Sequence, residues 1–138
     1  MRQFILSLLL ALSFFVFSCS SSENRSEFQA LTSGTWQLIL LNGKTIEKNG
    51  DNGIPDVRFT SDFGFSGYTG CNTFNGIYKI ENDKLILKPG AITKMFCAGS
   101  PEVEFLNAIL KVNGYKISSG FLYLLNDNKE LMRFKPQK

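Results

Sequence analysis

Short runs of alternating apolar and polar residues, separated by Gly, Asn and Asp, dominate the chain from about residue 32 onward. In the first run, residues 35–41, Trp36, Leu38 and Leu40 alternate with polar or outward positions and predict a half-buried strand. Asn42 and Gly43 follow, a pair typical of a type I′ hairpin turn, and predict a returning strand at residues 44–46. Further strands are predicted at residues 56–59, 63–68, 77–80, 85–87, 115–117, 121–125 and 130–134.

One helix is predicted among these strands. Ser100 is expected to cap it, Pro101 suits its first position, and Glu102 and Glu104 lie at its positive end. An apolar stripe at helical spacing follows, and Asn113–Gly114 is expected to end the helix, with Lys111 in its last turn. The stripe consists of Phe105, Leu106, Ile109 and Leu110. It can serve as a partner-binding face, but packing on the domain's own sheet is the favoured interpretation.

These elements predict an α+β, mostly β domain. We expect a small antiparallel sheet or partly open barrel, with one amphipathic helix packed on it, over residues 32–135. The run 121–125 is apolar at every position, so we expect this strand to be covered on both faces, by the helix on one of them.

The N-terminus has the features of an export signal. Residues 1–18 combine Arg2 with an apolar run over residues 4–17, too short to span a bilayer comfortably. Val16-Phe17-Ser18-Cys19 resembles a bacterial lipobox and predicts cleavage before a lipid-modified Cys19. Ser20 in place of Asp then implies sorting to an outer membrane where the cell has one. The alternative is an ordinary secretory signal with an incidental thiol. Residues 19–31 begin Ser-rich and polar and are expected to tether the domain to the lipid, and the alternative is a disordered tail with no role of its own.

Composition excludes several function classes. The net charge is only +3 over 138 residues, without a Lys/Arg cluster, which does not indicate a nucleic-acid partner. Histidine is absent, which excludes Ser-His-Asp and Cys-His catalysis and histidine metal ligation. The Asp- and Gly-containing loop 47–55 lacks the full spacing and terminal Glu of an EF-hand, so it is interpreted as a solvated loop. Glu102 and Glu104 stand two apart in the helix and point in different directions, unlike a catalytic pair. We therefore expect no metal, no cofactor and no enzymatic activity.

The number of cysteines predicts a disulfide. The chain has three cysteines, and acylation of Cys19 leaves Cys71 and Cys97 as an even pair in an oxidising compartment. Two alternatives remain open. Both residues can be buried free thiols, or Cys97 can be a reactive thiol whose pKa Lys94 lowers.

Residues in and around the Gly-rich stretch that precedes Cys97 resemble the motifs of a known family. Residues 65–67 and 70–76 resemble the central motif of the META domain, or HslJ-like, family, and residues 93–97 resemble its second motif. Residues 34–38, 42–43 and 101–106 resemble the family's opening strand, turn and helix, so the similarity extends from about residue 32 to residue 134. The motif positions are Gly67, Gly70, Cys71, Asn72, Gly76, Thr93, Met95 and Cys97.

The resemblance implies an envelope domain linked to heat-shock and novobiocin-resistance phenotypes, without implying a reaction. The leading hypothesis is a non-enzymatic envelope lipoprotein, a stress- or antibiotic-resistance-associated binding module that contacts the membrane through its N-terminal lipid. The alternative is a carrier of a lipid or small hydrophobic ligand, since META domains resemble lipid-binding secretion pilot proteins in shape and the chain has 13 phenylalanines. An inhibitor or assembly partner of an envelope protein is a third hypothesis. An apolar pocket of at least ~300 Å³ under the helix would favour the carrier.

Overall fold

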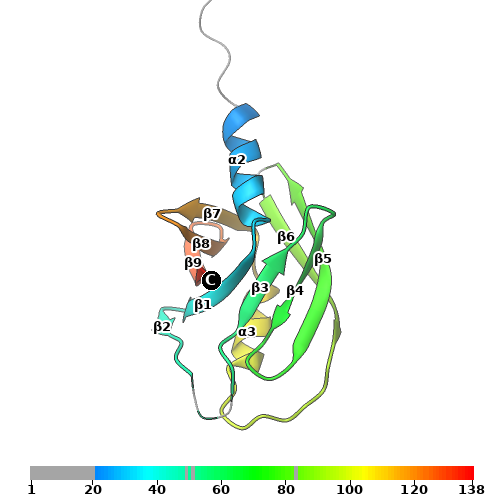
Figure 1. Cartoon of the computed structure of the whole chain (residues 1–138), viewed down its shortest axis with the longest axis vertical. Helices are drawn as coiled ribbons and strands as arrows, with labels where there is room; N and C mark the ends of the chain where they lie inside the picture. The colour runs from blue at the N-terminus through cyan, green and yellow to red at the C-terminus, as the bar shows by residue number, and fades with distance from the viewer. Residues whose placement is uncertain (1–20, 49, 51, 83) are drawn as a thin grey trace, which may run out of the picture.

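The computed structural model describes residues 21–48, 50, 52–82 and 84–138. The predicted signal peptide and Cys19 lie outside these residues. Within them are two helices, α2 (Ser21–Leu31) and α3 (Glu102–Ile109), and nine strands (Figure 1). The strands are β1 (Thr35–Leu41), β2 (Lys44–Thr45), β3 (Asp56–Phe59), β4 (Gly64–Tyr68), β5 (Thr73–Glu81), β6 (Lys84–Ile92), β7 (Gly114–Ser118), β8 (Phe121–Asn126) and β9 (Lys129–Pro136).

All nine strands belong to one antiparallel sheet. Its order is β6-β5-β4-β3-β1-β9-β8-β7, with the short β2 paired to β1. The sheet curves strongly, but β6 and β7 remain its two edges and are not hydrogen-bonded to each other in the part of the chain described. The predicted α+β, mostly β class with an open rather than closed sheet is therefore confirmed.

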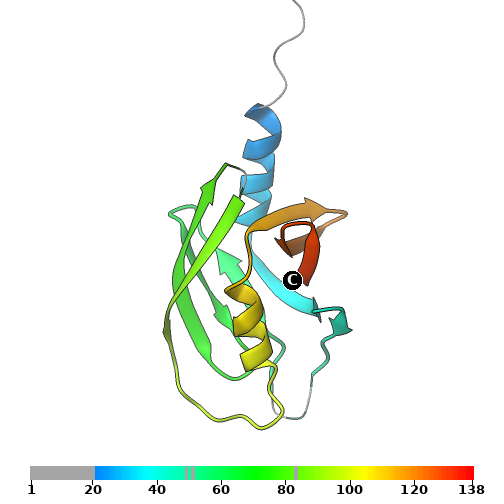
Figure 2. The same cartoon turned by 180° about the vertical axis from the view of Figure 1, so that it is seen from behind.

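Helix α3 packs on this sheet, as predicted. Figure 2 shows it (yellow) across the opening between the β5–β6 strands and the β7–β9 strands. It buries Phe105, Ala108 and Ile109. It begins one residue later than predicted, with Pro101 at the N-cap position, and the Ser100 hydroxyl accepts a 3.2 Å hydrogen bond from the Glu102 N–H.

The helix ends at Ile109, before the predicted stop at 113–114. Hydrogen bonds from Lys111 to Ala108 and from Val112 to Ile109 tighten the last turn, and the Asn113 N–H pairs with the Leu125 carbonyl in β8. Leu110 is consequently 67% exposed and does not belong to the buried stripe.

The hydrophobic core lies between the curved sheet and α3, but β1 reaches it differently from the prediction. Trp36 and Leu38 are buried as expected, whereas the third buried leucine is Leu41 and not Leu40. The pairing register with β9 shifts between Leu38 and Leu40. An irregularity of this kind moves the following side chains to the opposite face of the sheet, and here it precedes the β1–β2 turn.

Strand β8 is covered on one face only, contrary to the prediction. Leu122 and Leu124 are fully buried, and the alternate positions are partly exposed. On the outer face the Tyr123 ring lies 4.9 Å from the Lys116 ammonium and 5.0 Å from the Arg133 guanidinium. The charged ends of these two side chains thus lie over the Tyr123 ring on the face that no second layer of the described chain covers.

Residues 21–31 of the expected 19–31 tether form the helix α2 and are not an unstructured segment. Its end belongs to the core: Leu31 is fully buried, and the Trp36 indole N–H donates a 2.9 Å hydrogen bond to the Leu31 carbonyl. The Phe28 ring lies 6.0 Å from the Phe63 ring. Among the described residues, neither helix is long and apolar enough to cross a bilayer.

Candidate functional site

The two family-like motifs meet at one end of the molecule. The loop 69–72 between β4 and β5 lies against residues 93–97, which follow β6, and against the start of α3. Cys71 and Cys97 are joined by a disulfide with an S–S distance of 1.99 Å and a Cα–Cα distance of 5.7 Å. The predicted pairing is therefore present, and neither cysteine is a free thiol.

Asn72 is the centre of a buried polar network with Thr69, Thr93, Glu102 and the backbone of Met95. Its side chain is buried, with the residue only 1% exposed. The Oδ1 atom accepts hydrogen bonds from the Met95 N–H at 2.7 Å and from the Thr93 hydroxyl at 2.8 Å. The Nδ2 group donates to the Met95 carbonyl at 3.0 Å and to the two Glu102 carboxylate oxygens at 2.9 and 3.1 Å. One amide thus pairs with both backbone polar groups of Met95.

Thr69 completes the network from within the same loop. It is fully buried, and its hydroxyl accepts the Asn72 N–H at 2.8 Å while donating to the Glu102 carboxylate. Its own N–H donates to the Asn72 carbonyl at 2.8 Å. Glu102 stands at the first position of α3, where a carboxylate also interacts favourably with the helix dipole. These bonds fasten the loop, the segment after β6 and the helix to one another.

The motif glycines allow close approaches of the backbone. A Cβ at Gly67 would stand 2.1 Å from the Asp56 carbonyl oxygen, and one at Gly76 would stand 2.4 Å from the Lys88 carbonyl oxygen. Gly70 has φ +95, in the loop that carries the disulfide. The glycines therefore shape the sheet and the loop.

The structure gives Glu102 and Thr69 roles that the sequence did not predict. Sequence reasoning took Glu102 only as a favourable helix start and did not single out Thr69. A hydroxyl residue three positions before Asn72, inside a glycine-rich turn, is the signal that could have indicated the local bond to the Asn72 N–H. Lys94 is exposed and takes no part in the network.

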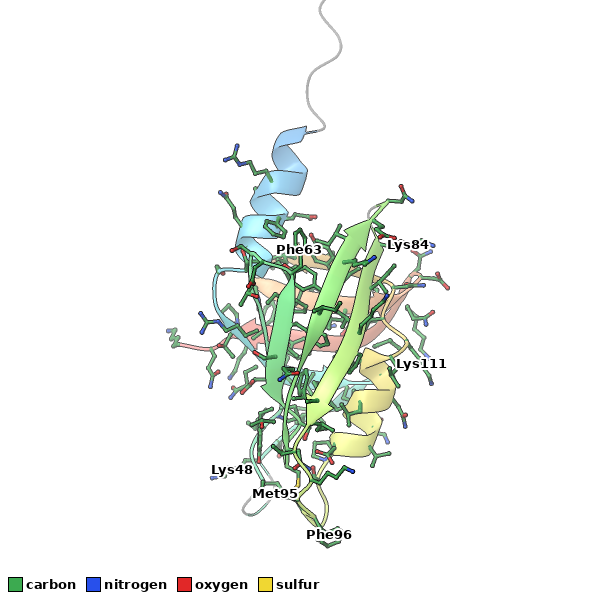
Figure 3. All side chains as sticks on the ribbon, turned by 90° about the vertical axis from the view of Figure 1, so that its right-hand side faces the viewer. Lys48, Phe63, Lys84, Met95, Phe96 and Lys111 are labelled. Carbon is green, nitrogen blue, oxygen red and sulfur yellow. A yellow bond between two sulfur atoms is a disulfide. The ribbon has the colours of Figure 1, made fainter. Side chains whose placement is uncertain are left out.

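Two apolar side chains at this end face solvent. Met95 is 61% exposed and Phe96 is 94% exposed. Figure 3 shows both at the end of the molecule opposite α2, with Lys48 near them. We call residues 93–97 the tip loop. Its backbone is held by Asn72 and by the disulfide at Cys97, so its apolar side chains project from an anchored segment.

The most strongly shifted tyrosine lies away from this end. Burial raises the pKa of Tyr78 to about 12, with smaller contributions from Tyr115 and Asp62. The Tyr78 hydroxyl donates a 2.8 Å hydrogen bond to the Thr60 carbonyl, and the Tyr78 ring packs edge-on against the Phe59 ring with their centroids 5.3 Å apart. This hydroxyl is a packed structural group.

Two surface grooves bear on the carrier hypothesis. The larger, of about 710 Å³, runs beside α3 and is lined mainly by Asn, Lys, Glu and Ser side chains and a few apolar ones. A smaller groove of about 380 Å³ lies between Phe63 and β5 and contains Ile77 and Ile80. Under α3 the space is occupied by core side chains such as Phe105, Phe74 and Phe134. Neither groove is thus the apolar pocket under the helix that a carrier was expected to have.

Comparisons with known proteins agree with the resemblance in the sequence. Residues 29–138 match the family model of the META domain. A protein solved by NMR is 28% identical, with a TM-score of 0.63 over 79% of this chain and 93% of its own. An NMR structure of a protein from Burkholderia xenovorans is 20% identical, with a TM-score of 0.61 over 92% of this chain and 99% of its own.

The fold recurs in a crystal structure of a DUF4847 family protein from Bacteroides vulgatus ATCC 8482, which is 19% identical, with a TM-score of 0.56 over 78% of this chain and 96% of its own. No curated protein matches the chain. Because the family match extends over most of the chain and includes both motifs of the buried polar network, this protein belongs to the META domain family.

Proposed function

We propose that this META domain is a non-enzymatic binding module of the bacterial cell envelope, and that it binds its partner through Met95 and Phe96 of the tip loop. The observation that carries the proposal is the exposure of Phe96, which is 94% accessible on a loop fastened by a disulfide and a buried asparagine. Large apolar side chains exposed in this way mark interaction sites.

The family-like motifs divide into a framework and an exposed residue. Gly67, Gly76, Asn72 and the two cysteines have structural explanations in close backbone approaches, hydrogen bonds and the disulfide. Met95 differs from them, because its backbone is held on both sides while its side chain is 61% exposed. Because the framework holds the Met95 backbone while its side chain stays exposed, we infer that this side chain takes part in binding.

Anchoring favours binding for a thermodynamic reason. Ordering a flexible side chain or loop costs roughly 0.5–1.5 kcal/mol per immobilised side chain when a partner binds. The tip loop has already lost most of its backbone freedom in the free protein. Met and aromatic residues are also enriched at protein interfaces, where their large polarisable surfaces pack well.

Several observations support a non-enzymatic role over a catalytic one. The Glu102 carboxylate is engaged by Asn72 and Thr69, and the Cys97 thiol is consumed by the disulfide. The carrier hypothesis has less support, because core side chains occupy the space between sheet and helix.

The envelope location is part of the proposal and rests on the sequence. If Cys19 carries a lipid, Cys19→Ala should release the protein from membranes or block its maturation, as fractionation and mass measurement would reveal. The protein would then be held at its α2 end, and the tip loop, at the opposite end, would face away from its own membrane (Figure 3). The link to heat or antibiotic stress rests on the family resemblance alone.

Site-specific photocrosslinking in cells tests the tip loop directly. A photoreactive phenylalanine analogue replacing Phe96 should yield a discrete crosslinked protein under at least one growth condition, including heat and antibiotic stress. The same analogue replacing Phe63, which is 49% exposed and lies beside Phe28 of α2, is the matched control. Adducts that are absent at position 96, or equal at both positions, would contradict the proposal. A Phe96→Ala variant should lose the partner while its stability changes by no more than about 0.5 kcal/mol.

A further inference from the structure

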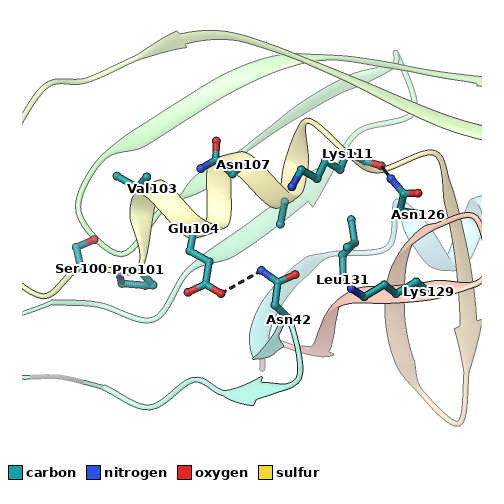
Figure 4. A pocket seen from close by; sticks show the side chains of 11 residues that line it. Asn42, Ser100, Pro101, Val103, Glu104, Asn107, Lys111, Asn126, Lys129 and Leu131 are labelled. Atoms are coloured by element: carbon teal, nitrogen blue, oxygen red, sulfur yellow. Dashed lines mark hydrogen bonds between the residues drawn. The ribbon is translucent and has the colours of Figure 1, made fainter.

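The larger groove is separate from the tip loop and has a composition suited to a ligand of its own. It is about 710 Å³ in volume, within the range of roughly 300–1,000 Å³ that small-molecule sites occupy. Figure 4 shows α3 along one side and the residues of the β1–β2 and β8–β9 turns along the other. Its floor is apolar, since Ala108 and Leu131 are 3% and 4% exposed.

Charges of opposite sign lie at different places along this groove. Glu104 lies nearer the start of α3, past Ser100 and Pro101, and its Oε1 atom accepts a 3.0 Å hydrogen bond from the Asn42 amide. Lys111 and Lys129 stand farther along, near Asn126 (Figure 4). Within the described residues, neither lysine has a carboxylate within salt-bridge distance. Among the residues that the structure describes, the groove therefore presents two ammonium groups without a paired carboxylate and one carboxylate hydrogen-bonded through Oε1.

The groove walls are already positioned for polar contacts. The Asn126 amide donates a 2.8 Å hydrogen bond to the Lys111 carbonyl. This bond fixes the Asn126 side chain. Asn42 is likewise fixed by its bond to Glu104. Asn107 is exposed on α3 and adds an amide beside the groove. These side chains provide hydrogen-bonding groups between the anionic and cationic ends.

We propose that this groove binds a short extended peptide with free termini, its carboxylate near Lys111 and Lys129 and its ammonium near Glu104. The lengths agree: Glu104 to Ile109 spans about 7.5 Å of α3 at about 1.5 Å per residue, and the tightened turn to Lys111 brings the backbone separation to roughly 10 Å. A chain of about three extended residues spans roughly the same distance. A purely anionic ligand would place a negative charge beside Glu104, and a lipid tail would meet a mostly polar wall.

Titration of the full chain in detergent micelles with trialanine tests the proposal. In NMR spectra, the backbone signals of Asn107, Ala108 and Leu131 should shift on binding. C-terminal amidation and N-terminal acetylation of the peptide should each weaken binding by about threefold or more, because each removes one end charge.

Matched variants assign each charge. Lys129→Gln and Lys111→Gln should weaken the free peptide but leave the amidated peptide nearly unaffected, and Glu104→Gln should do the same for the acetylated one. Lys84→Gln removes an exposed lysine at the far end of the molecule and should change nothing (Figure 3). Absence of groove shifts at millimolar peptide, or affinities insensitive to both terminal modifications, would overturn the assignment. Equal binding of a neutral trisaccharide at the same signals would overturn it as well.

Discussion

Replacing Asn72 by alanine should be among the most damaging single changes in this domain. The variant deletes the amide that pairs with the Met95 N–H at 2.7 Å and with the Met95 carbonyl at 3.0 Å. Asn72 is 1% exposed and its two bonds to the Met95 backbone are partly buried, so water can replace the deleted amide only in part. A buried polar group left without a partner costs about 1–3 kcal/mol.

The Met95 N–H and carbonyl account for most of the expected loss in the free energy of unfolding. The Thr93 hydroxyl and the Glu102 carboxylate, which also lose a bond, belong to residues that reach solvent and can recover hydration. With partial water entry at Met95, we expect a loss of about 3–4 kcal/mol in the free energy of unfolding. This is a large share of the ~5–15 kcal/mol by which domains are stable.

Urea unfolding at pH 7 with the disulfide intact measures this loss, read from the midpoint at constant m-value. Asn107→Ala, on the exposed side of α3, is the matched control and should lie within about 0.5 kcal/mol of the parent. If Asn72→Ala unfolds within about 1 kcal/mol of the parent, the buried polar network does not hold the tip loop.

Asn72→Asp separates geometry from charge. It keeps an acceptor for Met95 but places a second carboxylate about 3 Å from the Glu102 oxygens in place of the amide donor. The like charge raises the folded-state pKa of the new carboxyl above its unfolded value. Its destabilisation should therefore be full at neutral pH and should diminish as the pH falls and a shared proton binds. Stability of this variant that is independent of pH would contradict the proximity of the two groups.

Three further changes probe the framework. Reducing the disulfide, or Cys71→Ser, reopens a loop with a sequence separation of 26 and should cost about 3.5 kcal/mol by the chain-entropy relation, seen as a lower melting temperature; unchanged melting would refute a closed bridge. Gly67→Ala would push a Cβ into a carbonyl oxygen 2.1 Å away and should destabilise by roughly 2–3 kcal/mol, whereas Gly34→Ala meets nothing within 4 Å and should be nearly neutral in the same urea assay. Because the pKa of Tyr78 is raised to about 12 in the folded state, unfolding releases its proton between pH 10 and 12, so stability should fall as pH rises through that window, and Tyr78→Phe should remove this slope.

Local rules located most strands and their turns, but β5 and β6 extend well beyond the predicted residues 77–80 and 85–87. Asn42 and Gly43 both have positive φ values, 48° and 82°, as a type I′ turn requires, and Ser119 and Gly120 have 53° and 78°. Such turns depend on which residues tolerate a left-handed backbone, a property of single residues. The alternation of apolar residues marked most strands for the same reason, since side chains point to alternate faces in every strand.

Tertiary packing overruled local rules where two segments had to fit each other. The register shift between Leu38 and Leu40 buries Leu41 in place of Leu40. The sequence of β1 alone does not predict this shift. Helix α2 forms where composition indicated a tether, because its last turn buries Leu31 beneath the Trp36 side chain. The polar composition of this segment does not predict that its last residue, Leu31, is buried.

The candidate site shows the same division most clearly. The motif positions and a Cys71–Cys97 pair could be predicted from the sequence, because an expected export signal and an even thiol count favour a disulfide. Only the folded chain brings Asn72 to Glu102, thirty positions away, and only there does one amide take both backbone groups of Met95. With its backbone satisfied inside, the tip loop turns the Met95 and Phe96 side chains outward, a direction set by hydrogen bonds between distant segments and not by any local pattern.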